Sequence, residues 1–290
     1  MSFQSGKIAA ETVLRFPGAA SKAAAKPSNA KPSNAKPSNA KPSNAKPAIA
    51  APLLPVLIVL HQECSTPGRV GNALRALGHR LDIRRPRFGD PLPETLDDHA
   101  GAVMFGGPMS ANDPDDYIRQ EIDWISVPLR EQRPFLGICL GAQMLAMQLG
   151  ARVAPHPEGR TEIGYYPIRP TAAGMALCPH WPDHVYHWHR EGFNLPAGAE
   201  LLAEGGDFPI QAFRADHCFG FQFHPDVTYA MMHRWTTRGH ERFELPGARP
   251  RHHHFADRAV HDVAERAWLK AFLDGWLARM PLSVMSEAAE

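Results

Sequence analysis

Cysteine is scarce in this chain of 290 residues, and the four that occur are scattered. Cys64, Cys139, Cys178 and Cys218 form no CxxC pair, which argues against a disulfide scaffold and against a structural zinc knuckle. No apolar run approaches the ~18 residues that a helical membrane span needs. We therefore expect a protein of a reducing compartment, cytoplasmic in location and without membrane contact.

Lysine is almost absent after residue 50, where only Lys270 remains. Residues 1–50 carry eight basic residues and one acid, Glu11, a net charge of +7, whereas the rest of the chain has 23 basic and 29 acidic residues, a net charge of −6. This change in composition predicts a boundary near residue 50. Because the folded part is net acidic and has no basic stripe, nucleic acid is not expected as a partner.

The segment before the boundary has no large apolar residues in its repeat. KPSNA occurs four times over residues 26–45, and such a repeat cannot bury a core. We expect residues 1–50 to form a disordered basic low-complexity extension and residues 51–290 to form the folded domain. The repeat could be a tether for an acidic partner or a length-variable extension with no catalytic role, and the sequence leaves both open.

From residue 53 onward, short apolar runs alternate with helical stretches. Buried strands are predicted at residues 53–60, 79–85, 100–107 and 134–138, and helices at residues 68–78, 114–129 and 142–150. This order predicts an α/β fold whose mostly parallel sheet has helices on both faces. After residue 151 strand patterns dominate, which predicts an open mixed sheet with an antiparallel edge.

Two features near the carboxyl end complete this map. Residues 259–280 have the spacing of a long amphipathic helix that should pack on the sheet. The HHH run at residues 252–254 precedes it in a polar stretch, and we expect it in a surface loop.

Cys139 stands where a buried strand turns into a helix, between Gly137 and Gly141. A residue on such a turn presents its side chain at the carboxyl end of the sheet, and G-x-C-x-G is the thiol counterpart of the G-x-S-x-G elbow. The following helix directs its free N–H groups towards the sulfur, which favours a reactive thiolate. A small buried hydrophobic residue is the alternative.

A histidine and a carboxylate follow a second predicted strand, in GFQFHPD at residues 220–226. His224 and Asp226 are two residues apart, so in an extended chain both side chains project to the same side. The carboxylate could orient the imidazole while the imidazole acts as a base for Cys139. A turn with a hydrogen-bonded histidine is the alternative for the pair alone.

Three motifs together resemble the class I glutamine amidotransferases: GGPMS at residues 106–110, GICLGAQ at 137–143 and FQFHPD at 221–226. They occur in that family's order and spacing, and the resemblance covers residues 55–240. The resemblance extends to free-standing proteins that are similar to the glutaminase domain of GMP synthase. The resemblance implies flavodoxin-like layering of the sheet and helices. The family usually has glutamate where this chain has Asp226.

What the resemblance implies is a glutaminase with a catalytic triad. Cys139 would attack the side-chain amide of glutamine, His224 would move the proton with Asp226 as its orienter, and water would release glutamate from a γ-glutamyl thioester. The backbone N–H groups of Leu140 and Gly107 would bind the oxyanion.

Further residues are candidates for substrate contacts. Gln143, at the start of the helix after Cys139, is expected to hold the substrate, with a water-facing polar residue as the alternative. In HWHREGF, His189 and Glu191 are expected near the acceptor side of the site. His187 and His189 could share a metal-ligand face, but no matching cluster of carboxylates or thiols is evident in the sequence, so we predict neither metal nor cofactor.

The chain lacks a P-loop and a G-x-G-x-x-G after a strand, so it is not expected to activate an acceptor with ATP. The leading hypothesis is a glutamine amidotransferase subunit that passes ammonia to a separate synthetase. The second is a stand-alone cysteine hydrolase or peptidase that acts on γ-glutamyl compounds. The third is a non-catalytic regulatory protein, against which the set Cys139, His224 and Asp226 argues.

Overall fold

A computed structural model describes residues 52–278, and the extension predicted for residues 1–50 lies outside them. Within the described part, the main sheet has eight strands in the order β2-β1-β3-β4-β12-β11-β10-β7. The pairs from β2 to β12 are parallel, and those from β12 to β7 are antiparallel. The predicted α/β fold with an open, mostly parallel mixed sheet is confirmed.

The strands are short and follow the predicted apolar runs closely. Their bounds are β1 Val56–Val59, β2 Leu81–Arg84, β3 Gly101–Met104, β4 Phe135–Ile138, β5 Val153–Pro155, β6 Glu162–Pro167, β7 Arg169–Pro170, β8 His184–His189, β9 Glu191–Phe193, β10 Glu200–Glu204, β11 Ile210–Ala215 and β12 Cys218–Phe221.

The helices are more varied in length. Their bounds are α1 Gly68–Ala76, α2 Asp116–Trp124, α3 Ser126–Arg130, α4 Leu140–Gln148, α5 Ala172–Leu177, α6 Tyr229–Arg238 and α7 Arg251–Ala278, with the 3-10 turns η1 Pro86–Phe88 and η2 His240–Glu244.

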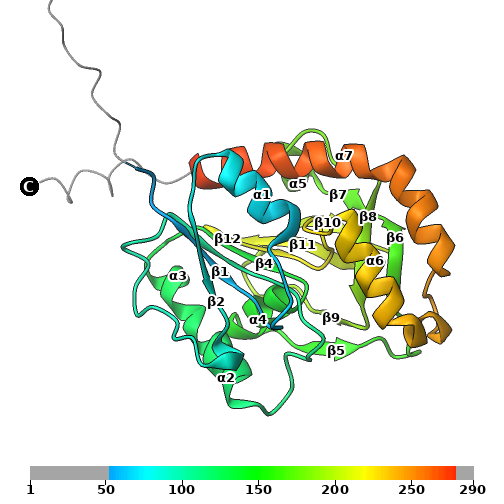
Figure 1. The fold of residues 1–290 in the computed structure, drawn as a ribbon, viewed down its shortest axis with the longest axis horizontal. Coiled ribbons are helices and arrows are strands. Elements are labelled where there is room, and N and C mark those ends of the chain that lie inside the picture. The colour runs from blue at the N-terminus through cyan, green and yellow to red at the C-terminus, as the bar shows by residue number, and fades with distance from the viewer. Residues whose placement is uncertain (1–51, 279–290) are drawn as a thin grey trace, which may run out of the picture. The chain divides into compact units, whose positions relative to one another are not determined.

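The sheet separates two hydrophobic cores, because successive side chains of a strand point to opposite faces. In β1, Val56 and Ile58 pack with α1 and α7, whereas Leu57 and Val59 pack with α2 and α4. Figure 1 shows these layers, with α1 and α7 on one side of the sheet and α2, α3 and α4 on the other. Both faces are therefore covered, as the continuous apolar strands predicted.

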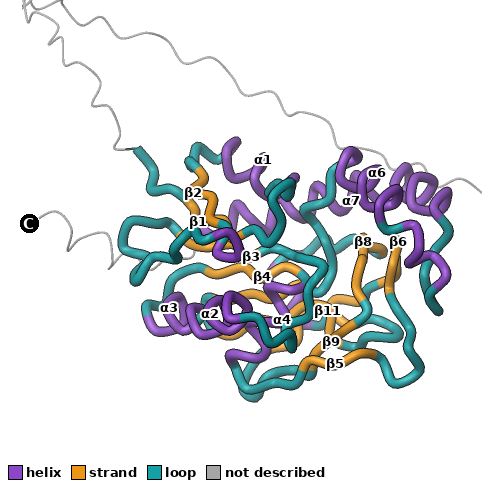
Figure 2. The backbone as a smooth tube through the Cα atoms, turned by 60° about the horizontal axis from the view of Figure 1, so that its bottom comes forward, coloured by secondary structure: helices purple, strands orange, loops and turns teal. Residues whose placement is uncertain are grey.

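Two separate two-stranded sheets lie outside the main sheet, where the sequence predicted one mixed sheet. β6 pairs antiparallel with β8, and β5 pairs antiparallel with β9. In Figure 2 the β6–β8 pair lies close to α6 and α7, and α7 contacts both strands. Within residues 52–278, no helix combines the length and the apolar character needed to cross a membrane.

The HHH run lies in a helix and not in the predicted loop, although His252 and His253 are exposed at the surface as expected. Helix α7 begins at Arg251 and includes all three histidines. His254 is fully buried: its Nδ1 accepts a hydrogen bond from the Tyr186 hydroxyl at 2.9 Å, and its Nε2 donates to the Arg249 carbonyl at 3.0 Å. The residues around His254 are polar, which suggested an exposed segment. Its buried partner Tyr186 is distant along the chain, so no pattern in the sequence indicated the contact.

The passage from β4 into α4 depends on two glycines. A Cβ atom on Gly137 would lie 2.4 Å from the Gly141 carbonyl oxygen, and a Cβ atom on Gly141 would lie 2.2 Å from the Met104 carbonyl oxygen. Both obstacles are backbone atoms, which cannot rotate away as a side chain would. Strand and helix can therefore approach this closely only with glycine at both positions.

We predict that Gly141→Ala destabilises the protein. Alanine in a helix is favoured over glycine by about 1 kcal/mol, but overpacking against a rigid backbone costs about 1–3 kcal/mol or more, so the clash should dominate. Urea unfolding followed by circular dichroism measures the difference. Gly206→Ala is the matched control, since nothing lies within 4 Å of its added Cβ atom; equal midpoints for the two variants would contradict the prediction.

Candidate active site

Cys139 has a strained backbone conformation, with φ 50° and ψ −103°. Its N–H donates to the Phe221 carbonyl at 2.7 Å, and its carbonyl accepts from the Gln143 N–H at 2.9 Å. Such strain in a residue other than glycine costs about 1–3 kcal/mol and persists where the surroundings enforce it. The predicted elbow is thus present, with Cys139 at the N-terminus of α4.

His224 lies directly opposite this turn, although β12 already ends at Phe221. Its backbone N–H donates to the Tyr186 carbonyl at 2.7 Å, and its Nδ1–H donates to Asp226 Oδ1 at 3.1 Å. Gly106 lies between the histidine and the cysteine and contacts both. A Cβ atom added to Gly106 would lie 2.6 Å from His224 Cε1 and 3.4 Å from Cys139 Cβ. The structure therefore brings Cys139, His224 and Asp226 together, and their action as a catalytic triad stays a prediction.

The charge state of His224 follows from these neighbours. Burial alone would lower the pKa of its imidazole, but the negative charge of Cys139, the charge of Asp226 and the hydrogen bonds to both residues outweigh burial and raise the pKa to about 10. The imidazole is therefore held as an imidazolium at neutral pH. A protonated ring beside a cysteine at a helix N-terminus is an arrangement that favours a reactive sulfur.

The loop after β3 carries Gly107, next to the start of α4. A Cβ atom on Gly107 would lie 3.1 Å from the Leu140 side chain and 3.0 Å from His61 Cβ. The two residues expected to bind an oxyanion, Gly107 and Leu140, are thus neighbours at the Cys139 turn. That their backbone N–H groups bind an oxyanion stays a prediction.

Sequence reasoning missed the pair that supports this loop. His61, directly after β1, donates from Nε2 to Glu121 Oε2 at 2.8 Å, and its Nδ1 lies 3.3 Å from the Gly106 carbonyl oxygen. Both side chains are fully buried. The available signal was Glu121 itself, a carboxylate on the apolar face of α2 beside Ile118 and Trp124.

Gln143 and His189 meet at one backbone carbonyl. Gln143 is buried and does not face water; its Nε2 donates to the Glu191 carbonyl at 3.0 Å and to Gln222 Oε1 at 3.3 Å. His189 Nδ1 donates to the same Glu191 carbonyl at 3.0 Å. Glu191 thus takes part through its backbone, and both ring nitrogens of His189 have partners inside the protein.

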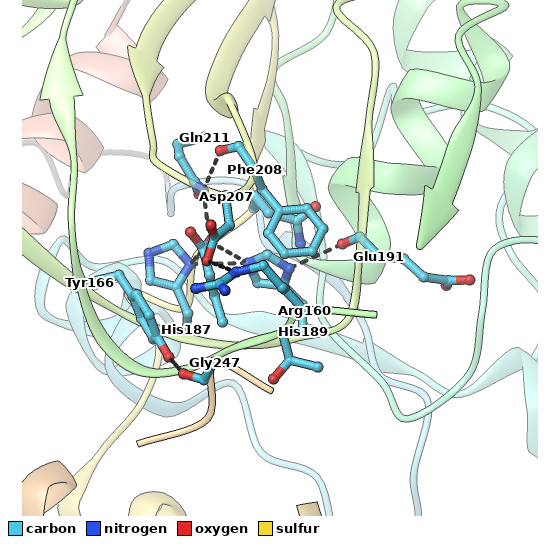
Figure 3. Close-up of polar contacts among 12 residues, drawn as sticks. Arg160, Tyr166, His187, His189, Glu191, Asp207, Phe208, Gln211 and Gly247 are labelled. Atoms are coloured by element: carbon cyan, nitrogen blue, oxygen red, sulfur yellow. Dashed lines mark hydrogen bonds and ion pairs between the residues drawn. The ribbon is translucent and has the colours of Figure 1, made fainter. Parts of the chain in front are cut away.

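The partner of the other His189 nitrogen is Glu162, a second residue that sequence reasoning missed. Glu162 Oε2 lies 3.0 Å from His189 Nε2, 3.3 Å from His187 Nδ1 and 2.9 Å from Gln211 Nε2, which donates to it. Figure 3 shows His187, His189 and Gln211 converging, with Phe208 against the His189 ring. The pairing arises because β6 and β8 place Glu162 opposite His189, which no spacing in the sequence reveals.

The pKa values of Glu162 and His187 are both shifted strongly downwards in this cluster. Burial alone would raise the pKa of Glu162, but His187, His189 and Gln211 outweigh burial and lower that pKa to about 2. Burial is the largest cause that lowers the pKa of His187 to about 3. The cluster therefore holds a carboxylate and a neutral His187 at neutral pH.

Glu162, His187 and His189 could also hold a metal ion, since their ligand atoms all lie within 4.8 Å of one another. Two histidines and a carboxylate suit zinc or iron. However, Glu162 Oε2 already accepts a hydrogen bond from Gln211 Nε2 and lies 3.0 Å from His189 Nε2, so this carboxylate has hydrogen-bond partners without an ion. The absence of a metal stays our prediction.

Comparisons with known proteins agree with this fold and these motifs. The family model described as "Glutamine amidotransferase class-I" matches residues 65–236. The glutamine amidotransferase-like protein YfeJ of Salmonella typhimurium is 32% identical over 224 residues, which cover 73% of this chain and 90% of that protein. The glutamine-hydrolysing GMP synthase of Thermomicrobium roseum is 32% identical over 174 residues.

Solved structures give the same result. A glutamine amidotransferase of Methylobacillus flagellatus has a TM-score of 0.74 and 26% identity, covering 79% of this chain and 96% of that one. A glutamine amidotransferase of Thermotoga maritima has a TM-score of 0.70 and 28% identity, covering 77% of this chain and 98% of that one.

The chain belongs to the class I glutamine amidotransferase family. It is similar to the glutamine-hydrolysing GMP synthases over 57% of its own length, and it spans 31% of the length of the Thermomicrobium protein.

We predict that the His224 imidazolium persists to about pH 10 and that Cys139→Ser lowers the pKa of His224, because the substitution removes the negative charge beside the ring. Long-range ¹H–¹⁵N NMR of the imidazole nitrogens measures both values. The exposed His252 provides a reference signal that the substitution should not change. A His224 pKa that is the same in both proteins would contradict the ion pair.

We also predict that removing metal changes nothing. Dialysis of the purified protein against EDTA should leave the melting temperature unchanged, and elemental analysis should find only sub-stoichiometric zinc and iron. A fall in melting temperature that added zinc restores would instead assign a metal to Glu162, His187 and His189, since these are the described residues whose ligand atoms lie close enough.

Proposed function

We propose that this chain hydrolyses the side-chain amide of glutamine through a thioester on Cys139, and that it releases glutamate and ammonia. The observation that carries the proposal is the strained Cys139 beside an imidazolium that Asp226 orients. No other pair of described residues combines a nucleophile at a helix N-terminus with a histidine of raised pKa.

The steps follow from the charges. The Cys139 thiolate attacks the amide carbon, the carbonyl oxygen becomes an oxyanion, and the N–H groups of Gly107 and Leu140 stabilise it. The His224 imidazolium gives its proton to the amide nitrogen, so that the C–N bond breaks and ammonia leaves. His224, now neutral, takes a proton from water, which attacks the thioester and restores the thiolate–imidazolium pair.

The destination of the ammonia is also part of the proposal. The similarity to glutamine-hydrolysing GMP synthases supports a separate synthetase that receives it. A second candidate is a stand-alone hydrolase of γ-glutamyl compounds, and a pocket beside His224 with room for more than ammonia favours it.

We predict that purified protein releases ammonia and glutamate from L-glutamine, and that Cys139→Ala abolishes this release. Removing the nucleophile of a catalytic triad lowers kcat by several orders of magnitude, about as much as removing the whole triad. Glutamate dehydrogenase-coupled detection measures the release. Cys64→Ala, which removes an exposed thiol, is the matched control and should keep the wild-type rate.

Equal release by wild type and Cys139→Ala would contradict the thioester route. Release in the wild type that a synthetase partner increases would favour the amidotransferase subunit. Faster turnover of γ-glutamyl amides than of glutamine would favour the stand-alone hydrolase.

A further inference from the structure

A pocket of about 250 Å³ opens beside His224. His224, Gly106 and Gly107 form its inner end, next to the Cys139 turn. The indole rings of Trp188 and Trp235 also line it, and the Trp235 ring lies 4.9 Å from the His224 ring, edge to face. The pocket therefore leads from the proposed site of bond cleavage towards the surface.

The outer part of this pocket is basic. Arg234 and Arg238 are four residues apart on α6, and Arg242 follows in η2, so that all three line the same pocket. The acidic residue among the lining side chains is Glu241. Three guanidinium groups against one carboxylate leave the pocket with a net positive charge.

Two of these arginines have no carboxylate partner. Among residues 52–278, no carboxylate oxygen lies within salt-bridge distance of Arg234 or Arg238, and Arg242 reaches Glu241 only at 3.9 Å. By contrast, Arg69 on α1 and Arg258 on α7 both pair with Asp262. Unpaired guanidinium groups at a pocket offer bidentate donors to an anion, and the indoles beside them reduce screening by water.

The pocket lies on the side of the leaving group. In the proposed reaction His224 delivers its proton to the departing nitrogen, and His224 lines the pocket. Gln143, our candidate for holding the glutamyl part, does not line it and points instead to the Glu191 carbonyl and to Gln222. A group bound near the arginines would therefore be attached to the departing amine.

We infer that this pocket is a subsite for a carboxylate on the leaving amine, so that the site accepts γ-glutamyl derivatives of amino acids. The inference rests on the proposed thioester chemistry. The C–N bond breaks, the proton of His224 passes to the nitrogen, and the amino acid leaves as the amine; water then releases glutamate from Cys139. Ammonia alone would leave the three arginines without a role.

The test compares two substrates that share the glutamyl part. γ-Glutamylglycine has a carboxylate on its leaving amine, whereas γ-glutamyl ethylamide has a methyl group in its place. We expect kcat/KM to be about tenfold higher for γ-glutamylglycine, because charge-assisted hydrogen bonds are strong but partly screened at this exposed position.

Substitutions of the arginines test whether they cause the preference for γ-glutamylglycine. Arg234→Gln and Arg238→Gln should each lower kcat/KM for γ-glutamylglycine about three- to tenfold and leave the ethylamide unchanged. Arg75→Gln, which changes an exposed and unpaired arginine on α1 away from the pocket, is the matched control and should affect neither substrate.

The outcomes separate the two proposals. Equal rates for both substrates in wild type would overturn the subsite and keep the thioester chemistry. An equal fall for both substrates in the variants would place the arginines at the shared glutamyl carboxylate and also overturn it. If neither these compounds nor glutamine is hydrolysed, the proposed function fails, and calorimetry decides the subsite: salt-sensitive binding of γ-glutamylglycine to the wild type, lost in Arg238→Gln, supports it, and no binding overturns it.

Discussion

The direct contact between the backbones of β3, β4 and α4 is the constraint on which the rest of the site depends. Gly137 and Gly141 leave no side chain between strand and helix, so the Gly141 Cα packs on the Met104 carbonyl. That approach sets the angle of the turn and holds Cys139 in its positive-φ conformation. The position of the sulfur and the direction of the first N–H groups of α4 are consequently properties of the backbone, which makes the site rigid before any ligand arrives.

The other half of the site comes from a different part of the chain and is anchored by main-chain contacts as well. β12 runs parallel to β4, so that Phe221 is level with Ile138 and the two strands end together. The Asp226 carbonyl accepts the Arg69 N–H at 2.8 Å, and this bond fixes the backbone of the residue that orients His224. The family usually has glutamate at this position; here the aspartate, despite its shorter side chain, still reaches the imidazole.

Much of this could be predicted from sequence because the signals are local. The strand–turn–helix around Cys139 and the pair His224 and Asp226 each lie within a few residues, and their strand ends are brought together by the parallel order of the fold. Glu162 and Glu121 could not be found in this way, since each acquires its role from a histidine far away in sequence. The same reason hid His254, which is buried only because Tyr186 on β8 lies beneath α7. Contacts between side chains that are distant in sequence, as across the β6–β8 ladder, are what the sequence leaves undetermined.

The contact between Arg69 and Asp226 has a further consequence. Arg69 lies in the first turn of α1, which packs on one hydrophobic core, whereas the body of α4 packs on the core at the opposite face of the sheet. The helices that position the reacting groups thus pack on both cores, and a molecule in which only one core has formed lacks one of these supports. Recovery of turnover during refolding would therefore coincide with the slower of the two cores, and in a heated sample inactivation would mark the first core to loosen.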